Sequence, residues 1–216
     1  MRTPRTGVSQ AIAATLAREI ITGRREPGSP LRQERIAAEF QSSHVPVREA
    51  LLTLQSEGLA VYRPRRGAVV APLCVEDVED IMDMRVELEA LALRLAARSG
   101  TINQAGAGAA LDRAEGSSDI DVLVEANRDF HHALYAPCGR ARLLAAIGEL
   151  GLHSERYLRT VWRELGYQGK SDAGHREILA RLRAGDAPGA EAALRTHIRD
   201  AGEELAAHLP RSAGTE

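Results

Sequence analysis

The order of short segments in the first 73 residues is the feature that most constrains the fold. A first segment has apolar residues at helical spacing: Val8, Ile12, Leu16 and Ile20. Two shorter helical segments follow, one marked by Leu31 to Phe40 and the next by Val47 to Leu54. Two β-prone runs, 59–63 and 68–71, then flank a basic turn. Three helices and a hairpin with a basic tip predict a winged helix-turn-helix.

In such a domain the third helix enters the major groove of DNA with its first residues at the base edges. A polar break precedes this helix, and Ser43 is its expected N-cap. We expect Arg48 to bind guanine or a phosphate, and the wing arginines to follow the backbone or the minor groove. The residues predicted to bind DNA are Arg35, Ser43, His44, Val45, Val47, Arg48, Arg65, Arg66 and Gly67.

Charge divides the chain at the same place. Residues 1–73 hold 11 arginines and six glutamates, a net of +5, whereas residues 74–216 hold 17 basic and 24 acidic groups, a net of −7. We therefore predict two domains, 1–73 and 74–216, of which the first faces a polyanion. The alternative to DNA binding is that the arginines of residues 1–73 are solvated charges on a small protein-binding domain.

Composition excludes several classes of protein. With 44% hydrophobic and 27% charged residues, the chain resembles an ordinary globular protein. It has no run of 18 apolar residues, so no membrane helix is expected. Its two cysteines, Cys74 and Cys138, are too few for a disulfide scaffold. We expect a cytoplasmic protein.

From Val75 onward nearly every segment has helical periodicity, which predicts an all-α bundle and a mainly α protein. The first helix of this half carries Arg85 and Glu89 within its apolar stripe. Either the two residues form a buried or interfacial ion pair, or they await a polar ligand. Residues 99–119 are rich in Gly, Ala and Ser and give no clear pattern.

Three different helices of this half each direct a histidine towards the core: His131, His175 and His197. A single buried histidine is usually a hydrogen-bonded structural residue, but three would each need a partner. One shared divalent ion such as Zn²⁺ or Ni²⁺ would serve all three. Asn127 precedes His131 by one turn and could add a carbonyl oxygen, whereas His132 faces water.

The N-terminal half resembles the DNA-binding domain of GntR-type bacterial transcriptional regulators. The resemblance rests on Pro46-Val47-Arg48-Glu49-Ala50-Leu51, on Glu57-Gly58-Leu59 and on Arg66-Gly67-Ala68. Members of this family usually have Arg where this chain has His44, a difference that concerns the choice of operator bases.

The C-terminal half resembles the FCD domain, the helical effector domain of the FadR-like branch. The matching pieces are Arg85-x-x-x-Glu89, Asn127-x-x-Phe130-His131, His175-x-x-Ile178 and His197. The resemblance implies that Asn127, His131, His175 and His197 hold a metal, and that the protein is a homodimer. Arg85, Glu89 and His153 are the residues expected to contact an effector.

These observations predict a DNA-binding regulator, not an enzyme, that acts as a repressor on a pseudo-palindromic double-stranded operator. A small organic acid bound at the metal site would control it. Two alternatives remain at this point. One is a metal-dependent hydrolase or lyase with an accessory DNA-binding domain, and the other is a regulator that senses the metal itself.

Overall fold

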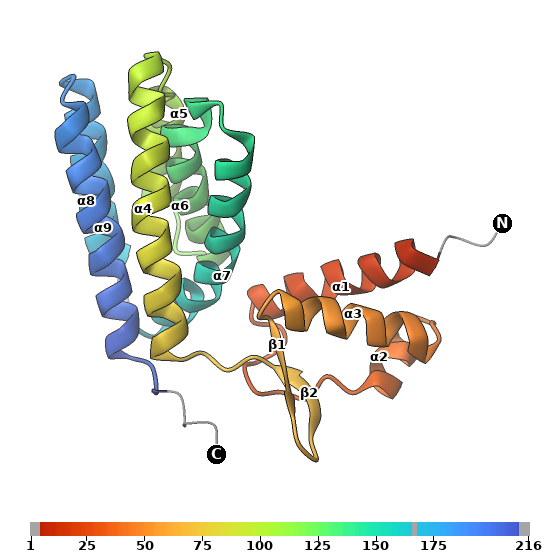
Figure 1. The fold of residues 1–216 in the computed structure, drawn as a ribbon. Coiled ribbons are helices and arrows are strands. Elements are labelled where there is room, and N and C mark those ends of the chain that lie inside the picture. The colour runs from red at the N-terminus through yellow and green to blue at the C-terminus, as the bar shows by residue number, and fades with distance from the viewer. Residues whose placement is uncertain (1–4, 166–167, 212–216) are drawn as a thin grey trace. The chain divides into compact units, whose positions relative to one another are not determined.

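The computed structural model describes residues 5–165 and 168–211, which contain nine α-helices and one two-stranded sheet (Figure 1). The chain divides into two compact units, Met1–Leu73 and Cys74–Glu216. The first unit contains three helices and the sheet, and the described part of the second is helical. The prediction of a mainly α protein, with a winged helix-turn-helix followed by a helical bundle, is confirmed.

The helices of the first unit are α1 (Arg5–Ile21), α2 (Gln33–Glu39) and α3 (His44–Ser56). α1 packs against α3, and the side chains between them form one hydrophobic core. That core includes Ile12, Leu16, Ile20, Val47, Leu51 and Leu54. The helical spacing of these residues in the sequence therefore reflects burial along one face of each helix.

The break between α2 and α3 turns the chain sharply. Gln41 has a left-handed backbone with φ of 47°, a conformation that few residues other than glycine adopt. Ser43 takes the N-cap position with an extended backbone, but its side chain makes no capping hydrogen bond. The predicted N-cap position is thus right, whereas the exposed Ser43 hydroxyl does not cap the helix.

The wing is an antiparallel hairpin of β1 (Ala60–Arg63) and β2 (Gly67–Val70). At its tip Arg65 and Gly67 both have positive φ, of 63° and 73°. Gly67 pairs with Arg63, so β2 begins one residue before the predicted run 68–71. The tight turn leaves the side chains of Arg65 and Arg66 exposed.

The second unit is a bundle built around α4 (Figure 1). Its α-helices are α4 (Val75–Ser99), α5 (Gln104–Glu115), α6 (Ile120–Tyr135), α7 (Ala141–Leu165), α8 (Gln168–Arg183) and α9 (Ala187–Ala207). A short 3₁₀ helix, Ala136–Cys138, follows α6. α4 contacts α6, α7 and α9, while α8 packs against α9 and α5 against α6. This arrangement brings α6, α8 and α9 together, the three helices that carry the candidate histidines.

Side-chain caps begin three of these helices. Asp119 accepts a hydrogen bond from the Asp121 N–H, and Asp186 accepts one from the Gly189 N–H. Asn103 caps α5 in the same way by accepting from the Gly106 N–H. α5 lies within the stretch 99–119, for which no clear pattern was predicted. It forms there despite its glycines because its buried alanines pack against α6.

Within residues 5–165 and 168–211, none of the helices combines the length and hydropathy that a membrane span requires.

Candidate functional site

The start of α3 presents an exposed polar and basic surface. Ser43, His44, Val45 and Arg48 are all exposed there, with Val45 at 47%. Arg35, on α2, is also exposed. These side chains are therefore available to a ligand such as DNA.

Val47 is a correction to the predicted DNA-binding set. Its side chain is 0% exposed and belongs to the core between α1 and α3. Successive residues of a helix are about 100° apart, so neighbours in sequence can lie on different faces. Val47 lies on the inner face of α3, whereas Val45 and Arg48 lie on its outer face. Its role is to anchor α3, and it does not contact a base.

A groove of about 370 Å³ runs between α3 and the wing. Three arginines line it: Arg32, Arg48 and Arg66. No acidic side chain is found among the described residues of its lining, so its electrostatic character is basic. Tyr62, 68% exposed, lies on the wing side of the groove.

Arg32 and Tyr62 were not in the predicted set. Arg32 precedes α2, and Tyr62 lies on β1, so only the folded chain brings them to the same groove as Arg48. An exposed aromatic residue beside the basic turn is the sequence signal that could have indicated Tyr62. Half-buried Gly67 also lines the groove, whereas Arg65 projects at the tip of the wing.

The second unit brings His131, His175 and His197 together. The ring centroid of His175 is 5.2 Å from that of His131 and 4.3 Å from that of His197. One ring nitrogen from each of the three lies within 4.8 Å of the others. His131 and His175 are buried, whereas His132 is exposed on the opposite face of α6.

The spacing of these nitrogens fits a metal. The Nε2 atoms of His131 and His175 are 3.3 Å apart. Two nitrogens bound tetrahedrally to Zn²⁺ at 2.0–2.1 Å from the ion would be separated by about 3.3 Å. The three imidazoles could therefore hold one divalent ion.

The protonation of two of the rings also suits a metal. Burial is the main cause that lowers the pKa of His197 to about 3, and the nearby His131 and Arg85 act in the same direction. Burial, followed by the nearby His197 and His131, holds the pKa of His175 well below its usual value. Both rings are therefore neutral near pH 7 and keep a lone pair for a metal ion.

Gly174 leaves the space that the His197 ring occupies. A Cβ atom at Gly174 would lie 2.6 Å from Nδ1 of His197 and 3.3 Å from its Cγ. Contacts this short would force the ring or the helix to move. The absence of a side chain on α8 therefore lets His197 reach the other two histidines.

A buried ion pair supports the cluster from α4. Arg85 donates from Nε to Glu89 Oε1 at 2.7 Å and from Nη1 to Ser154 Oγ at 3.0 Å. The other carboxylate oxygen, Oε2, lies 3.0 Å from Nδ1 of His131, within ion-pair distance, although neither atom makes a well-directed hydrogen bond. Glu89 thus joins the arginine to the histidine cluster, and the ion-pair interpretation of Arg85 and Glu89 is confirmed.

Glu89 is ionised in this network. Burial is the largest single influence on its pKa and acts to raise it. The neighbouring Arg85 guanidinium and His131 ring together outweigh burial and lower the pKa of Glu89 to about 2. The site therefore contains a buried carboxylate that orients both a guanidinium and an imidazole.

A cavity of about 330 Å³ adjoins the cluster between α4, α6 and α7. Arg85, Glu89 and His131 line one side of it, and Tyr135 and Ile147 contribute to the remaining wall. The volume is in the range that holds a small organic molecule. Two charged groups, Arg85 and Glu89, and one histidine of the cluster, His131, therefore line the same cavity.

Asn127 and His153 differ in their relation to this cavity. Asn127 is half-buried and lines it, one turn from His131. His153 is half-buried on α7, where its neighbours Ser154 and Glu155 line the cavity. His153 itself is not among the described residues that line the cavity. Ser154 was missed, since its contact with Arg85 joins positions 69 residues apart.

Comparisons with known proteins agree with this division. The profile of the bacterial regulatory proteins of the gntR family matches residues 8–70, and that of the FCD domain matches residues 80–200. A probable D-xylose utilization operon transcriptional repressor from Paenarthrobacter nicotinovorans is 31% identical over 98% of this chain and 92% of its own. A gluconate operon transcriptional repressor from Bacillus licheniformis is 40% identical over 36% of this chain and 32% of its own.

Solved structures give the same result. A GntR family member from Pseudomonas syringae pv. tomato is 30% identical, with a TM-score of 0.57, over 96% of this chain and 88% of its own. A putative GntR regulator from Rhodococcus sp. RHA1 has a TM-score of 0.80 over 93% of this chain and 98% of its own. At 23% identity, this second likeness concerns the fold alone.

A winged helix-turn-helix with a basic groove, joined to a helical unit with a histidine cluster, defines a DNA-binding transcriptional regulator. The hydrolase or lyase alternative is set aside, because the relatives are named as regulators. The chain belongs to the gntR family of bacterial regulatory proteins and carries an FCD domain.

Proposed function

We propose that this regulator is a homodimeric repressor of a pseudo-palindromic operator and that a small organic acid controls it. The observation that carries this proposal is the cavity of about 330 Å³, in which Arg85 and His131 lie on one lining. A carboxylate in that cavity would meet a guanidinium and the histidine cluster together. The names of the relatives as operon repressors support the direction of control.

The metal in this proposal is Zn²⁺ or Ni²⁺, held by Asn127, His131, His175 and His197. Neutral imidazoles suit both ions. When bound, the ion supplies a positive charge that attracts a carboxylate. Such a local charge is needed, because the second unit carries a net of −7 (17 basic against 24 acidic groups) that repels anions.

Arg85 would hold the effector. Its Nε and Nη1 atoms already donate within the described structure, to Glu89 and Ser154, and its guanidinium has further N–H groups to offer. The pair with Glu89 fixes the direction of the guanidinium before any ligand arrives. Binding would therefore require little rearrangement of Arg85.

A thermal-shift screen of carboxylic acids on metal-loaded protein tests this proposal. A ligand at about 100 times its Kd should raise the Tm by roughly 5–10 °C, because it binds only the folded state. Arg85→Lys should keep the charge beside Glu89 but lose most of this shift, since an ammonium lacks the planar fork of donors. Arg94→Lys, at an exposed site on the same helix, is the matched control.

Operator affinity measured with and without the acid decides the direction of control. The acid should weaken operator binding by the wild type and not by Arg85→Lys. If metal alone changes operator affinity and no acid does, the metal is the signal. If no acid shifts the Tm, the cavity is not an effector site.

Arg48 and Arg66 should differ in their effects on DNA binding. Arg48→Ala should cost on the order of 1–3 kcal/mol of operator affinity and relax base preference, because Arg48 is exposed on the first turns of α3. Arg66→Ala should weaken binding to all sequences alike and reduce the salt dependence, since it removes a phosphate contact at the wing. Gel shifts at two salt concentrations measure both effects. Wild-type operator affinity in Arg48→Ala would show that α3 is not the reading helix.

A further inference from the structure

A second, much smaller cavity borders the proposed metal site, between α5, α6, α7 and α8. Its volume is about 10 Å³, which is close to the space that a single water molecule needs. His175 lines it, and Asn127 lines both this small cavity and the effector cavity of about 330 Å³. Two of the four proposed metal ligands therefore border the small cavity.

Trp162 adds a buried hydrogen-bond donor to the small cavity. This residue on α7 is the only tryptophan of the chain, and it is 8% exposed. Its Nε1 atom has no hydrogen-bond acceptor among the described residues. Because a buried indole N–H ordinarily has a partner, the cavity that Trp162 lines is the place where that partner is expected.

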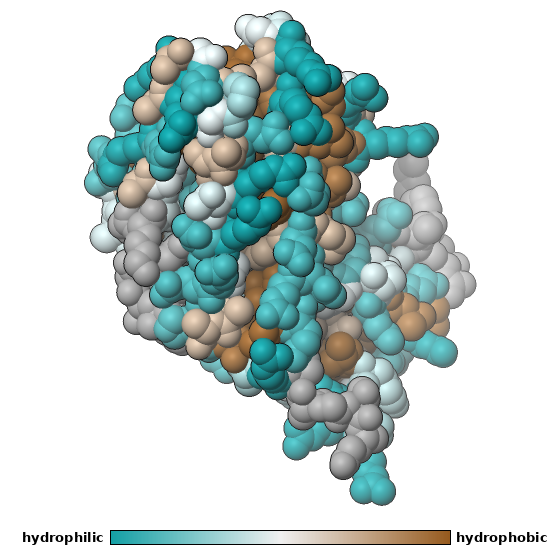
Figure 2. Space-filling model, turned by 60° about the vertical axis from the view of Figure 1, so that its left-hand side comes forward, coloured by the Kyte–Doolittle hydropathy of each residue, from teal (hydrophilic) through white to brown (hydrophobic). Residues whose placement is uncertain are grey.

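Asp172 adds an acceptor. It is half-buried on α8, one turn before His175, and it supplies the one carboxylate among the described residues that line the small cavity. Asp172 makes no hydrogen bond or ion pair within the described part of the chain, and Arg176, one turn further along α8, is paired with Glu115. Figure 2 shows hydrophilic side chains over much of the surface of the helical unit. Asp172 differs from these because it borders a cavity beside the metal site.

Asn127 makes a specific demand on its surroundings. Only the carbonyl oxygen of an amide offers lone pairs to a metal ion, whereas its NH₂ group is a donor. The two ends of the amide are nearly equal in size, so shape alone does not decide which of them meets the metal. A hydrogen-bond acceptor on the far side of the amide would decide it. An aspartate at this position would make no such demand, because both of its carboxylate oxygens can bind.

We propose that Asp172 is a positioning residue of the metal site, which acts on Asn127 through one water molecule in the small cavity. Nδ2 of Asn127 and Nε1 of Trp162 donate to this water, and the water donates to the Asp172 carboxylate. The NH₂ group of Asn127 is thereby held on the cavity side, and its Oδ1 atom is directed to the metal. Outer partners of this kind orient metal ligands and raise metal affinity. The inference rests on the metal in the proposed function and assigns the residues that support it.

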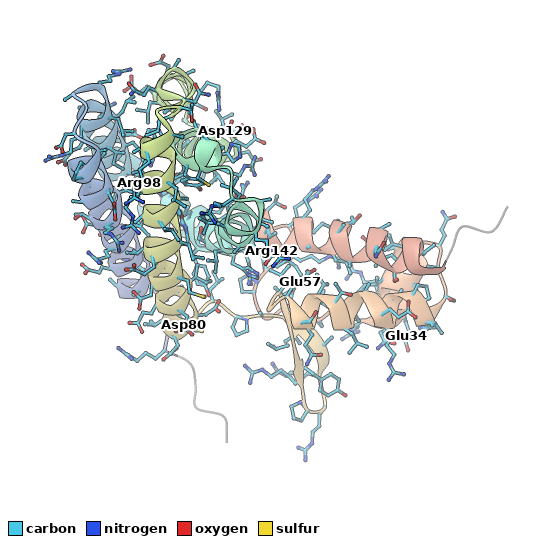
Figure 3. All side chains as sticks on the ribbon, turned by 45° about the horizontal axis from the view of Figure 1, so that its top comes forward. Glu34, Glu57, Asp80, Arg98, Asp129 and Arg142 are labelled. Carbon is cyan, nitrogen blue, oxygen red and sulfur yellow. The ribbon has the colours of Figure 1, made fainter. Side chains whose placement is uncertain are left out.

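Zn²⁺ titration of the full chain against a chromophoric chelator tests this assignment. Asp172→Ala should raise the Kd for Zn²⁺ by up to about 100-fold. Asp172→Asn removes the same charge but keeps an oxygen that accepts, so it should bind Zn²⁺ about tenfold more tightly than Asp172→Ala. Asp80→Ala, at an exposed site on α4, is the matched control and should bind like wild type (Figure 3).

A second background separates orientation from charge. Asn127→Asp provides two equivalent oxygens, so no NH₂ group has to be held. In this background Asp172→Ala and Asp172→Asn should have the same Kd to within about threefold, because the acceptor has no NH₂ group to hold. Trp162→Phe keeps an aromatic ring but loses the N–H donor. It should raise the wild-type Kd about threefold to tenfold and add little to Asp172→Ala, since both act through one water.

The metal-free proteins show whether Asp172 serves the fold rather than the metal site. Asp172→Ala should unfold at the same urea concentration as wild type, because Asp172 makes no hydrogen bond or ion pair with the described residues. An earlier transition would make Asp172 a structural residue and overturn the inference.

Other outcomes overturn the inference as well. Equal Zn²⁺ affinity in Asp172→Ala and Asp172→Asn would show that Asp172 acts by its charge alone. A difference between them that persists in the Asn127→Asp background would show that Asn127 is not the group that is held. Asp172→Ala protein that binds Zn²⁺ like wild type would remove the positioning role and leave the metal ligands of the proposed function intact. A wild type without affinity for Zn²⁺ would remove both.

Discussion

Purified His175→Ala protein is expected to contain almost none of the metal that the wild type carries. Loss of a group that only orients a ligand costs roughly 10–100-fold in metal affinity, and loss of a ligand should cost at least as much. Nε2 of His175 lies 3.3 Å from Nε2 of His131, so its removal opens one side of the cluster. Elemental analysis of the purified variants measures the effect.

His132→Ala is the matched control for this experiment. It removes an imidazole from α6 next to His131, but on the exposed face of the helix. Its metal content should equal that of the wild type. Equal metal content in His175→Ala and wild type would refute the proposed site.

Glu89→Ala should destabilise the second unit by roughly 3–5 kcal/mol. The substitution leaves the buried Arg85 guanidinium without its countercharge, and such a change is costly in a protein interior. His131 also loses the carboxylate that lies 3.0 Å from its Nδ1 atom. Denaturant unfolding followed by circular dichroism gives the free energy of unfolding.

A double substitution separates the charge from the packing. Arg85→Met/Glu89→Leu replaces both buried charges with apolar groups, which is often neutral or stabilising. It should recover most of the lost stability and still fail to respond to a carboxylic acid. A Glu89→Ala protein as stable as wild type would mean that the ion pair is not a significant part of the fold.

Much of the fold could be predicted from local patterns. The apolar spacing from Val8 to Ile20 and the caps at Asp119 and Asp186 lie where the structure begins helices or buries their faces. The three inward histidines could also be predicted, because helical periodicity alone tells His131 from His132. These features depend on residues within one or two turns of each other.

The features that could not be predicted depend on contacts across the fold. Ser154 reaches Arg85 from a different helix, and Arg32 and Arg66 line the same groove only once the wing has paired. Val47 shows a different limit. Its position in the family motif predicted a contact with DNA, whereas its position in the apolar pattern of α3 predicted a core residue. The Val47 side chain is 0% exposed, so it is a core residue.

Gly174 has a consequence for anyone who engineers this protein for heat resistance. Replacing glycine with alanine inside a helix usually gains about 1 kcal/mol. Gly148 on α7 is a suitable position for this substitution, since a Cβ atom there would have no neighbour within 4 Å. Gly174 is not, because its new methyl group would collide with the His197 ring. Glycine-to-alanine replacement would thus stabilise α7 at Gly148 but displace a histidine of the proposed metal site at Gly174, so helix propensity alone is a poor guide at Gly174.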